Sequence, residues 1–108
     1  MKTGDIVIAS FPYTDFTGFK ARPAVIVTAT TDKFGDIIIA MISSSVPAQQ
    51  SSFQIKIEPD NINNLKTTSI IKVNRLATIE KKMIAATIGK LDDDYLSEFK
   101  RLFKSLVN

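Results

Sequence analysis

Short apolar runs, separated by polar breaks that contain glycine or proline, make up most of this chain. The run FQIKI at residues 53–57 alternates between apolar and polar positions, which is the period of a strand with one buried face. The run DIIIAMIS at residues 36–43 is apolar almost throughout, which indicates a strand that is buried on both faces. The pattern predicts strands at residues 5–11, 23–30, 36–43, 53–57, 68–73 and 83–89.

The last run of the chain has helical spacing instead. Within residues 92–107, the side chains Tyr95, Phe99, Leu102 and Leu106 recur on one helical face. Aspartates stand at the start of this run and lysine and arginine near its end, an order that complements the helix dipole. We therefore predict one amphipathic helix of about 16 residues, roughly 24 Å long, that covers one side or end of a small sheet.

These elements predict a mainly β protein, α+β by content. Five or six short strands followed by one terminal helix favour a small, strongly curved antiparallel β-barrel, and the strand–helix–strand alternation of a parallel fold does not occur. The remaining segments, residues 12–22, 44–52, 58–66 and 74–82, are predicted to be loops, turns or connections. At 108 residues the whole chain, 1–108, is expected to form a single domain.

Composition narrows the chemistry that this domain can perform. The sequence has no cysteine and no histidine, which removes disulfides, thiolate metal sites and the usual general base near neutral pH. We expect no metal site and no cofactor. The net charge of +3 is compatible with nucleic acid as a partner. No apolar run approaches the roughly 20 residues of a membrane span, so a cytoplasmic protein without a membrane partner is expected.

Arg22 stands directly before Pro23, at the start of a predicted buried strand and after a glycine-containing loop. Pro23 fits the first position of a strand, where its missing N–H costs no ladder bond. An arginine in this place is either a solvated residue at the strand edge or a group that meets an anion. The composition and spacing of the residues leave both interpretations open.

Three stretches of the chain resemble a known protein family. GDIVIASFPYTDFTGFKARPAVIV is similar to the N-terminal signature of the MazF/PemK-type toxins of bacterial toxin–antitoxin systems. DIIIAMISS resembles the third strand of that family, which ends in a hydroxyl residue after an apolar run. RLATIEKKMIAATIGKLDDDYLSEFKRLF resembles its C-terminal part. The resemblance covers nearly the whole chain, and the ordered set of stretches is more specific than any one of them.

The resemblance implies a compact SH3-like β-barrel that forms a homodimer. It also implies a toxin of a type II toxin–antitoxin system, a metal-independent endoribonuclease that cleaves single-stranded RNA by 2′-hydroxyl attack and is inhibited by a cognate antitoxin. The family's catalytic pair falls on Arg22 and Ser43, and the latter is threonine in many relatives. An arginine fork matches two phosphate oxygens, and a serine hydroxyl can donate to a non-bridging oxygen.

Two departures leave the proton acceptor open. Some relatives carry a glutamate where this chain has Thr17, although Asp15 lies nearby. Some also carry an arginine–aspartate pair where this chain has Lys72 and Asn74, so the acidic member of that pair is missing. Further expected RNA contacts are phosphate binding by lysine and arginine, stacking on phenylalanine, and polar contacts to bases. The residues expected to bind RNA are Asp15, Phe16, Thr17, Phe19, Lys20, Ser44, Lys72, Asn74 and Arg75.

Each of these residues also has a structural interpretation. A serine that ends a strand, such as Ser43, usually begins a turn, and Phe16 and Phe19 could pack on the barrel or at a dimer interface. Lysine and arginine side chains at such positions are often ordinary surface charges. Two other functions also remain open: a toxin of the same fold that inhibits DNA gyrase without catalysis, and a family member that binds RNA but no longer cleaves it.

Overall fold

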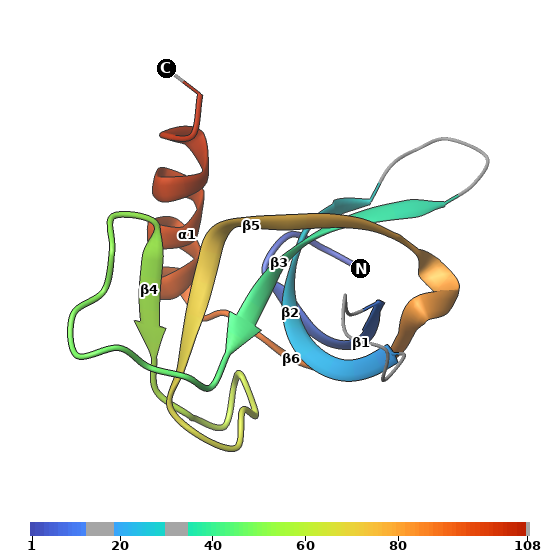
Figure 1. Cartoon of the computed structure of the whole chain (residues 1–108), viewed down its shortest axis with the longest axis horizontal. Helices are drawn as coiled ribbons and strands as arrows, with labels where there is room; N and C mark the ends of the chain where they lie inside the picture. Colours follow the sequence, from blue (N-terminus) through green and yellow to red (C-terminus); the bar gives the residue numbers. More distant parts are fainter. Residues whose placement is uncertain (13–18, 30–34, 108) are drawn as a thin grey trace.

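The computed structural model describes residues 1–12, 19–29 and 35–107 of the chain (Figure 1). Within these residues the chain forms one antiparallel sheet, a short 3₁₀ helix and one α-helix. This arrangement confirms the predicted mainly β fold with a C-terminal helix. The elements are β1 Asp5–Pro12, β2 Phe19–Ala29, β3 Asp36–Ser43, β4 Gln54–Ile57, β5 Ser69–Glu80, η1 Lys81–Met83, β6 Ile84–Lys90 and α1 Asp93–Lys104.

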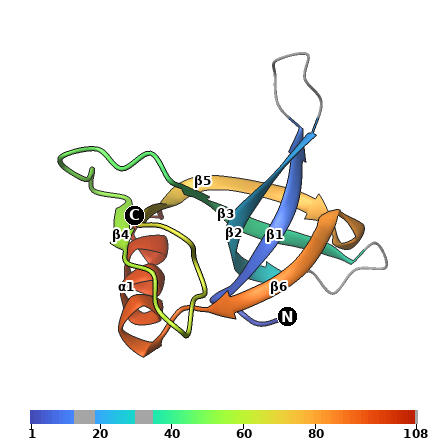
Figure 2. The ribbon, with the colours of Figure 1, turned by 90° about the horizontal axis from the view of Figure 1, so that it is seen from below.

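The sheet has six strands in the order β4-β5-β3-β2-β1-β6 within the described residues. Figures 1 and 2 show that it is strongly curved, with the long strands β2 and β5 bending along their length. The described hydrogen-bonded ladder is open, because β4 and β6 lie at its two edges. The two faces of the curved sheet pack into two separate apolar clusters.

Both faces of the sheet are buried along its central strands β1, β2 and β3. Ile6 and Val25 belong to a large apolar cluster that includes residues of α1, whereas their neighbours Val7 and Ala24 belong to a second cluster. Successive residues of a strand point to opposite faces, so β1 and β2 contribute alternately to the two clusters. The prediction that β3 is buried on both faces is confirmed by its buried isoleucines, which lie in both clusters.

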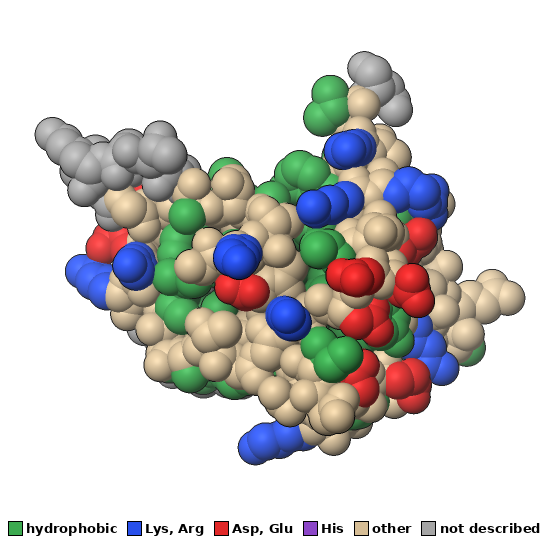
Figure 3. Space-filling model, turned by 180° about the vertical axis from the view of Figure 1, so that it is seen from behind, with side chains coloured by type: hydrophobic (Ala, Val, Ile, Leu, Met, Phe, Trp, Pro, Cys, Tyr) green, Lys and Arg blue, Asp and Glu red, His purple; other side chains and the backbone are tan. Residues whose placement is uncertain are grey.

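The helix α1 packs against one end of the sheet. Its first turn is capped by Asp92, whose carboxylate accepts a hydrogen bond from the Tyr95 N–H at 2.8 Å. Phe99 and Leu102 are buried in the large cluster. In Figure 3, basic side chains gather toward the C-terminal end on the α1 side and acidic side chains lie below them. In the part of the chain that the structure describes, no helix has the length and apolar character needed to cross a membrane.

Two predicted connections are wrong. Residues 19–22 are not loop, because β2 begins at Phe19 and pairs with β1 as far as Pro12. Residues 74–80 are not a connection, because β5 continues to Glu80 alongside β3. Both segments are less apolar than the strand cores. They adopt extended structure because a neighbouring strand supplies ladder partners for their backbone groups.

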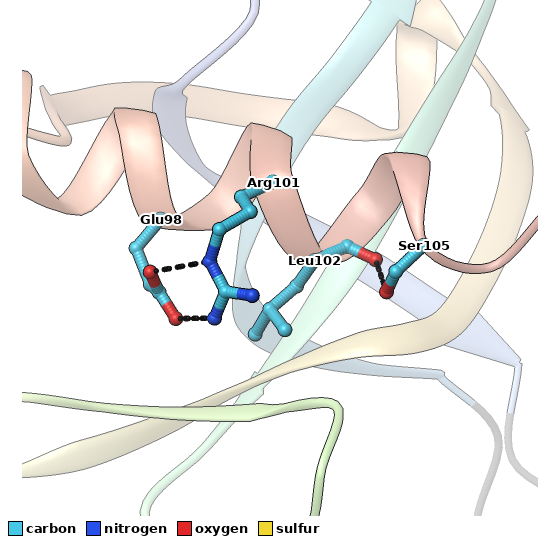
Figure 4. Close-up of polar contacts among 4 residues, drawn as sticks. All are labelled: Glu98, Arg101, Leu102 and Ser105. Atoms are coloured by element: carbon cyan, nitrogen blue, oxygen red, sulfur yellow. Dashed lines mark hydrogen bonds and ion pairs between the residues drawn. The ribbon is translucent and has the colours of Figure 1, made fainter.

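An ion pair joins two turns of α1 on its exposed side (Figure 4). Arg101 donates from Nη2 and Nε to the two carboxylate oxygens of Glu98, at 2.5 and 3.1 Å. The hydrogen bond from Arg101 lowers the pKa of Glu98, and the same contact raises the pKa of Arg101. Beside this pair, the Ser105 hydroxyl donates to the Leu102 carbonyl at 2.6 Å at the end of the helix. Both contacts lie in the C-terminal half of α1.

We predict that Asp92→Ala lowers the free energy of unfolding by about 1 kcal/mol, because it removes the acceptor at the helix N-cap. Asp92→Asn is the matched control, since the amide oxygen can still accept from the Tyr95 N–H. Urea denaturation followed by circular dichroism measures both variants. Equal losses for the two variants would show that the cap bond contributes nothing measurable.

We also predict that the Glu98–Arg101 pair stabilises the protein in a pH-dependent way. The pKa of Glu98 is lower in the folded state, so its contribution is present above the unfolded-state pKa and is lost as pH falls through the folded-state value. The stability difference between wild type and Glu98→Gln should therefore shrink on acidification below about pH 4 and in high salt. Thermal unfolding of both proteins at a series of pH values measures this stability difference. A difference that stays constant with pH would contradict this assignment.

Candidate functional site

A cavity of about 890 Å³ opens where β2, β3 and β5 lie side by side. Arg22 on β2, Ser43 at the end of β3, and Lys72 and Arg75 on β5 all line it. Ser44, which follows β3, lines it as well. All five residues were predicted from the sequence as site residues, and they come from three separate stretches of the chain. The sheet brings them together in one cavity.

The strand register explains why Arg22 and Ser43 face the same space. β2 and β3 pair antiparallel at Ala24↔Met41, Val25↔Ala40 and Ile26↔Ile39. Continuing this register by two residues places Arg22 opposite Ser43. Side chains directly opposite one another in an antiparallel pair share a face, with Cβ atoms about 4.5–5.5 Å apart.

The neighbouring strand β5 adds two cationic side chains to this face. Lys72 pairs with Met41, which puts its half-buried side chain on the face that Arg22 and Ser43 share. The pairing then shifts, because Ala40 pairs with Leu76, so β5 carries three extra residues between these positions. Such a bulge re-aims side chains relative to the regular ladder. Arg75 lies within it and lines the cavity, whereas the exposed Asn74 is not among the lining residues.

The hydroxyl of Ser43 is held by a turn at the end of β3. Its Oγ accepts a hydrogen bond from the Ser45 N–H at 3.2 Å. The structural interpretation of this serine, that it begins a turn, is therefore observed. This bond occupies a lone pair of the oxygen, and the hydroxyl hydrogen is still available to be donated to a ligand in the cavity.

The segment between β4 and β5 forms another wall, which sequence reasoning missed as part of the site. Asn64, Leu65, Lys66 and Thr67 line the cavity from this side. The sequence signal was only an asparagine-rich turn followed by Lys-Thr-Thr, and such a turn is typical of many surface loops. No local pattern shows that this turn lies beside Arg22, because the contact depends on how the sheet curves.

The charged side chains that line the cavity are all positive among the described residues. Four cationic side chains line it, and among the residues that the structure describes none of the lining residues is aspartate or glutamate. Apolar residues such as Ile8, Met41 and Ile88 line it as well. A lining that combines cations with apolar residues suits a ligand with negative charges and flat apolar rings. The described part of the chain contains no group of three or more acidic residues placed to hold a metal ion.

Some predicted RNA contacts lie outside what the structure describes. Asp15, Phe16 and Thr17 fall between β1 and β2, outside the described residues. Phe19 and Lys20 lie at the start of β2, where their backbones pair with Pro12 and Phe11. Their roles stay predictions.

Comparison with known proteins points to one family. The family described as PemK-like, MazF-like toxin of type II toxin-antitoxin system matches residues 2–107. No curated protein matches the sequence. Among solved structures, an endoribonuclease in complex with its cognate antitoxin from Mycobacterial species has a TM-score of 0.72 at 11% identity, covering 97% of this chain and 92% of that chain.

A second solved structure, the Mycobacterium tuberculosis toxin MazF-mt6, has a TM-score of 0.66 at 18% identity, covering 94% of this chain and 93% of that chain. At these identities the structural likeness shows the fold, and the family match over nearly the full length shows the membership. The chain therefore belongs to the PemK-like, MazF-like toxins of type II toxin–antitoxin systems.

Proposed function

We propose that this protein is an endoribonuclease toxin whose cavity binds and cleaves single-stranded RNA. The observation that carries the proposal is that Arg22 and Ser43 line one cavity together with further cations. The β2–β3 register, continued two residues beyond the Ala24↔Met41 pair, supports their lying opposite one another. The similar solved endoribonuclease, which is in complex with its cognate antitoxin, supports the same activity and an antitoxin partner. Family membership also supports a homodimer that acts in the cytoplasm.

The proposed reaction uses the nucleophile that RNA itself carries. The ribose 2′-hydroxyl loses its proton to solvent as its oxygen attacks the adjacent phosphorus, the bond from phosphorus to the 5′-oxygen breaks, and the 5′-oxygen takes up a proton from solvent. The products are a 2′,3′-cyclic phosphate and a 5′-hydroxyl. Negative charge accumulates on the phosphate oxygens in the transition state, so donors that are already aimed at them lower the barrier.

The residues of the cavity fit this electrostatic task. Arg22 presents a planar fork that can donate to two phosphate oxygens, and Ser43 can donate its hydroxyl hydrogen to the same group. Lys72 and Arg75 would hold neighbouring negative charge. We assign no general base, because the described lining residues include no carboxylate and the chain has no histidine.

We predict that Arg22→Ala lowers the rate of RNA cleavage by about 100-fold or more, since loss of one preorganised donor typically costs that much. Ser43→Ala should also slow cleavage, whereas Ser43→Thr keeps the hydroxyl and is the matched control. Cleavage of a long single-stranded RNA is followed by gel in EDTA, with circular dichroism to verify folding. Either alanine variant cleaving at the wild-type rate would refute the assignment.

The same assay with wild-type protein separates the three functions. Cleavage in EDTA supports the endoribonuclease. RNA binding without cleavage supports a family member that has lost catalysis. Neither binding nor cleavage, together with inhibition of purified DNA gyrase, supports the toxin that acts on gyrase.

We predict that Lys72→Gln weakens binding of a single-stranded RNA oligonucleotide several-fold to about tenfold, because it removes a charge-assisted hydrogen bond in a partly solvated site. Lys56→Gln is the matched control, since Lys56 lies on the adjacent strand β4, is exposed and does not line the cavity. Fluorescence anisotropy at constant salt measures both. Equal weakening by the two variants would point to net charge instead of a contact in the cavity.

A further inference from the structure

The segment at residues 58–68, between β4 and β5, is held in shape by its own polar side chains. Asp60 accepts from the backbone N–H groups of Ile62 and Asn63, at 2.9 and 2.7 Å. Asn63 is 1% exposed; its Oδ1 accepts from the N–H groups of Asp60 and Leu65, and its Nδ2 donates to the Glu58 carbonyl at 2.9 Å. A buried amide with this many partners fixes the backbone around it.

The 58–68 segment also lies beside the end of the edge strand β6 (Figure 2), and two hydrogen bonds join them. The Asn64 side chain donates to the Ile88 carbonyl at 2.7 Å, and the Lys90 N–H donates to the Ile62 carbonyl at 3.1 Å. Between these two bonds lies Gly89, where an added Cβ would stand 2.4 Å from the Ile62 carbonyl oxygen. Only glycine permits this close approach of the two backbones.

One of these two hydrogen bonds lies in the wall of the cavity, because Asn64 and Ile88 both line it. Asn64 has a positive φ of 55°, a conformation that asparagine tolerates, and it turns the chain from β6 toward the cavity. The residues that follow, Leu65, Lys66 and Thr67, line the cavity, and Lys66 and Thr67 are exposed there. A loop that is fixed before a ligand arrives pays less ordering entropy on binding.

The cavity has room for more than one phosphate. Its volume of about 890 Å³ lies near the upper end of the roughly 300–1,000 Å³ of ordinary ligand sites. Its cations come from separate elements: Arg22 from β2, Lys72 and Arg75 from β5, and Lys66 from the 58–68 segment. A polyanion with repeated charges matches this distribution better than a single phosphate does.

We propose that Lys66, supported by the Thr67 hydroxyl, binds a second phosphate next to the one held by Arg22 and Ser43. The inference rests on the proposed function, and it narrows the substrate to a single-stranded RNA segment that places at least two consecutive phosphates in the cavity. Gly89 is a positioning residue for this subsite, because it lets the 58–68 segment lie against β6.

The test measures the affinity of the full-length protein for a single-stranded RNA oligonucleotide with 2′-O-methyl groups, which lack the attacking hydroxyl. Each phosphate contact to a single strand contributes about 0.7 to the slope of log affinity against log salt. Lys66→Gln is expected to reduce that slope by about 0.7 and the affinity several-fold. The matched control Lys100→Gln, an exposed lysine on α1, is expected to leave the slope unchanged.

Gly89→Ala tests the positioning role by the same measurement. It is expected to reduce the salt slope as Lys66→Gln does, and the double variant is expected to lose little more than either single one. A variant that is only destabilised would contain less folded, binding-competent protein, but the slope of log affinity against log salt would stay the same. If Gly89→Ala does not fold, Asn64→Gly replaces it, since glycine keeps the positive φ but removes the hydrogen bond to Ile88.

The outcomes separate this inference from the proposed function. One outcome is that wild type binds the oligonucleotide and cleaves unmodified RNA while Lys66→Gln keeps the full salt slope. In that case the proposal of a second phosphate subsite is wrong, and the proposed endoribonuclease function still stands. If Lys66→Gln and Lys100→Gln reduce the slope equally, the effect is general charge and the subsite is also wrong. If wild type neither binds nor cleaves RNA, both proposals fall.

Discussion

The antiparallel register between β2 and β3 is the constraint on which the site depends. Buried side chains of both strands fill an apolar cluster on each face of the sheet, so a slip by one residue would exchange the two sets. Such a slip would move buried residues of one cluster into the other, and both clusters would then be poorly packed. The core thus maintains the alignment of the two strands whose ends bring Arg22 and Ser43 to the same cavity, although neither side chain belongs to the core.

Two irregular features complete the cavity around this pair. The three extra residues in β5 turn Arg75 toward the cavity, and the 58–68 segment contributes Lys66 from outside the sheet. Both features depart from regular pairing, and both add positive charge where the described wall has no acidic residue. A cavity of this kind attracts phosphate before any specific contact forms. In the proposed reaction its contribution would be electrostatic, since donors aimed at the charged phosphate oxygens lower the barrier.

Strand and helix positions followed well from local patterns where the period was strong. The alternation in β4, the apolar run of β3 and the helical stripe of α1 each persist over several residues, and the structure has all three elements. The extents of β2 and β5 were underestimated, since residues 19–22 and 74–80 lack a strong apolar period and are extended because they pair with β1 and β3. A single sequence does not display such pairing partners.

By itself, the sequence determined which residues could carry the chemistry: an arginine before the proline at the mouth of a strand, and a serine at the end of another. Its family pattern linked these two residues and indicated the fold. Only the tertiary structure decided that Lys66 joins them while Asn74 stays outside the cavity. The physical reason is that both placements depend on long-range contacts. A bulge in β5 sets the direction of the residues around Asn74, and close backbone contact at Gly89 fixes the segment that carries Lys66.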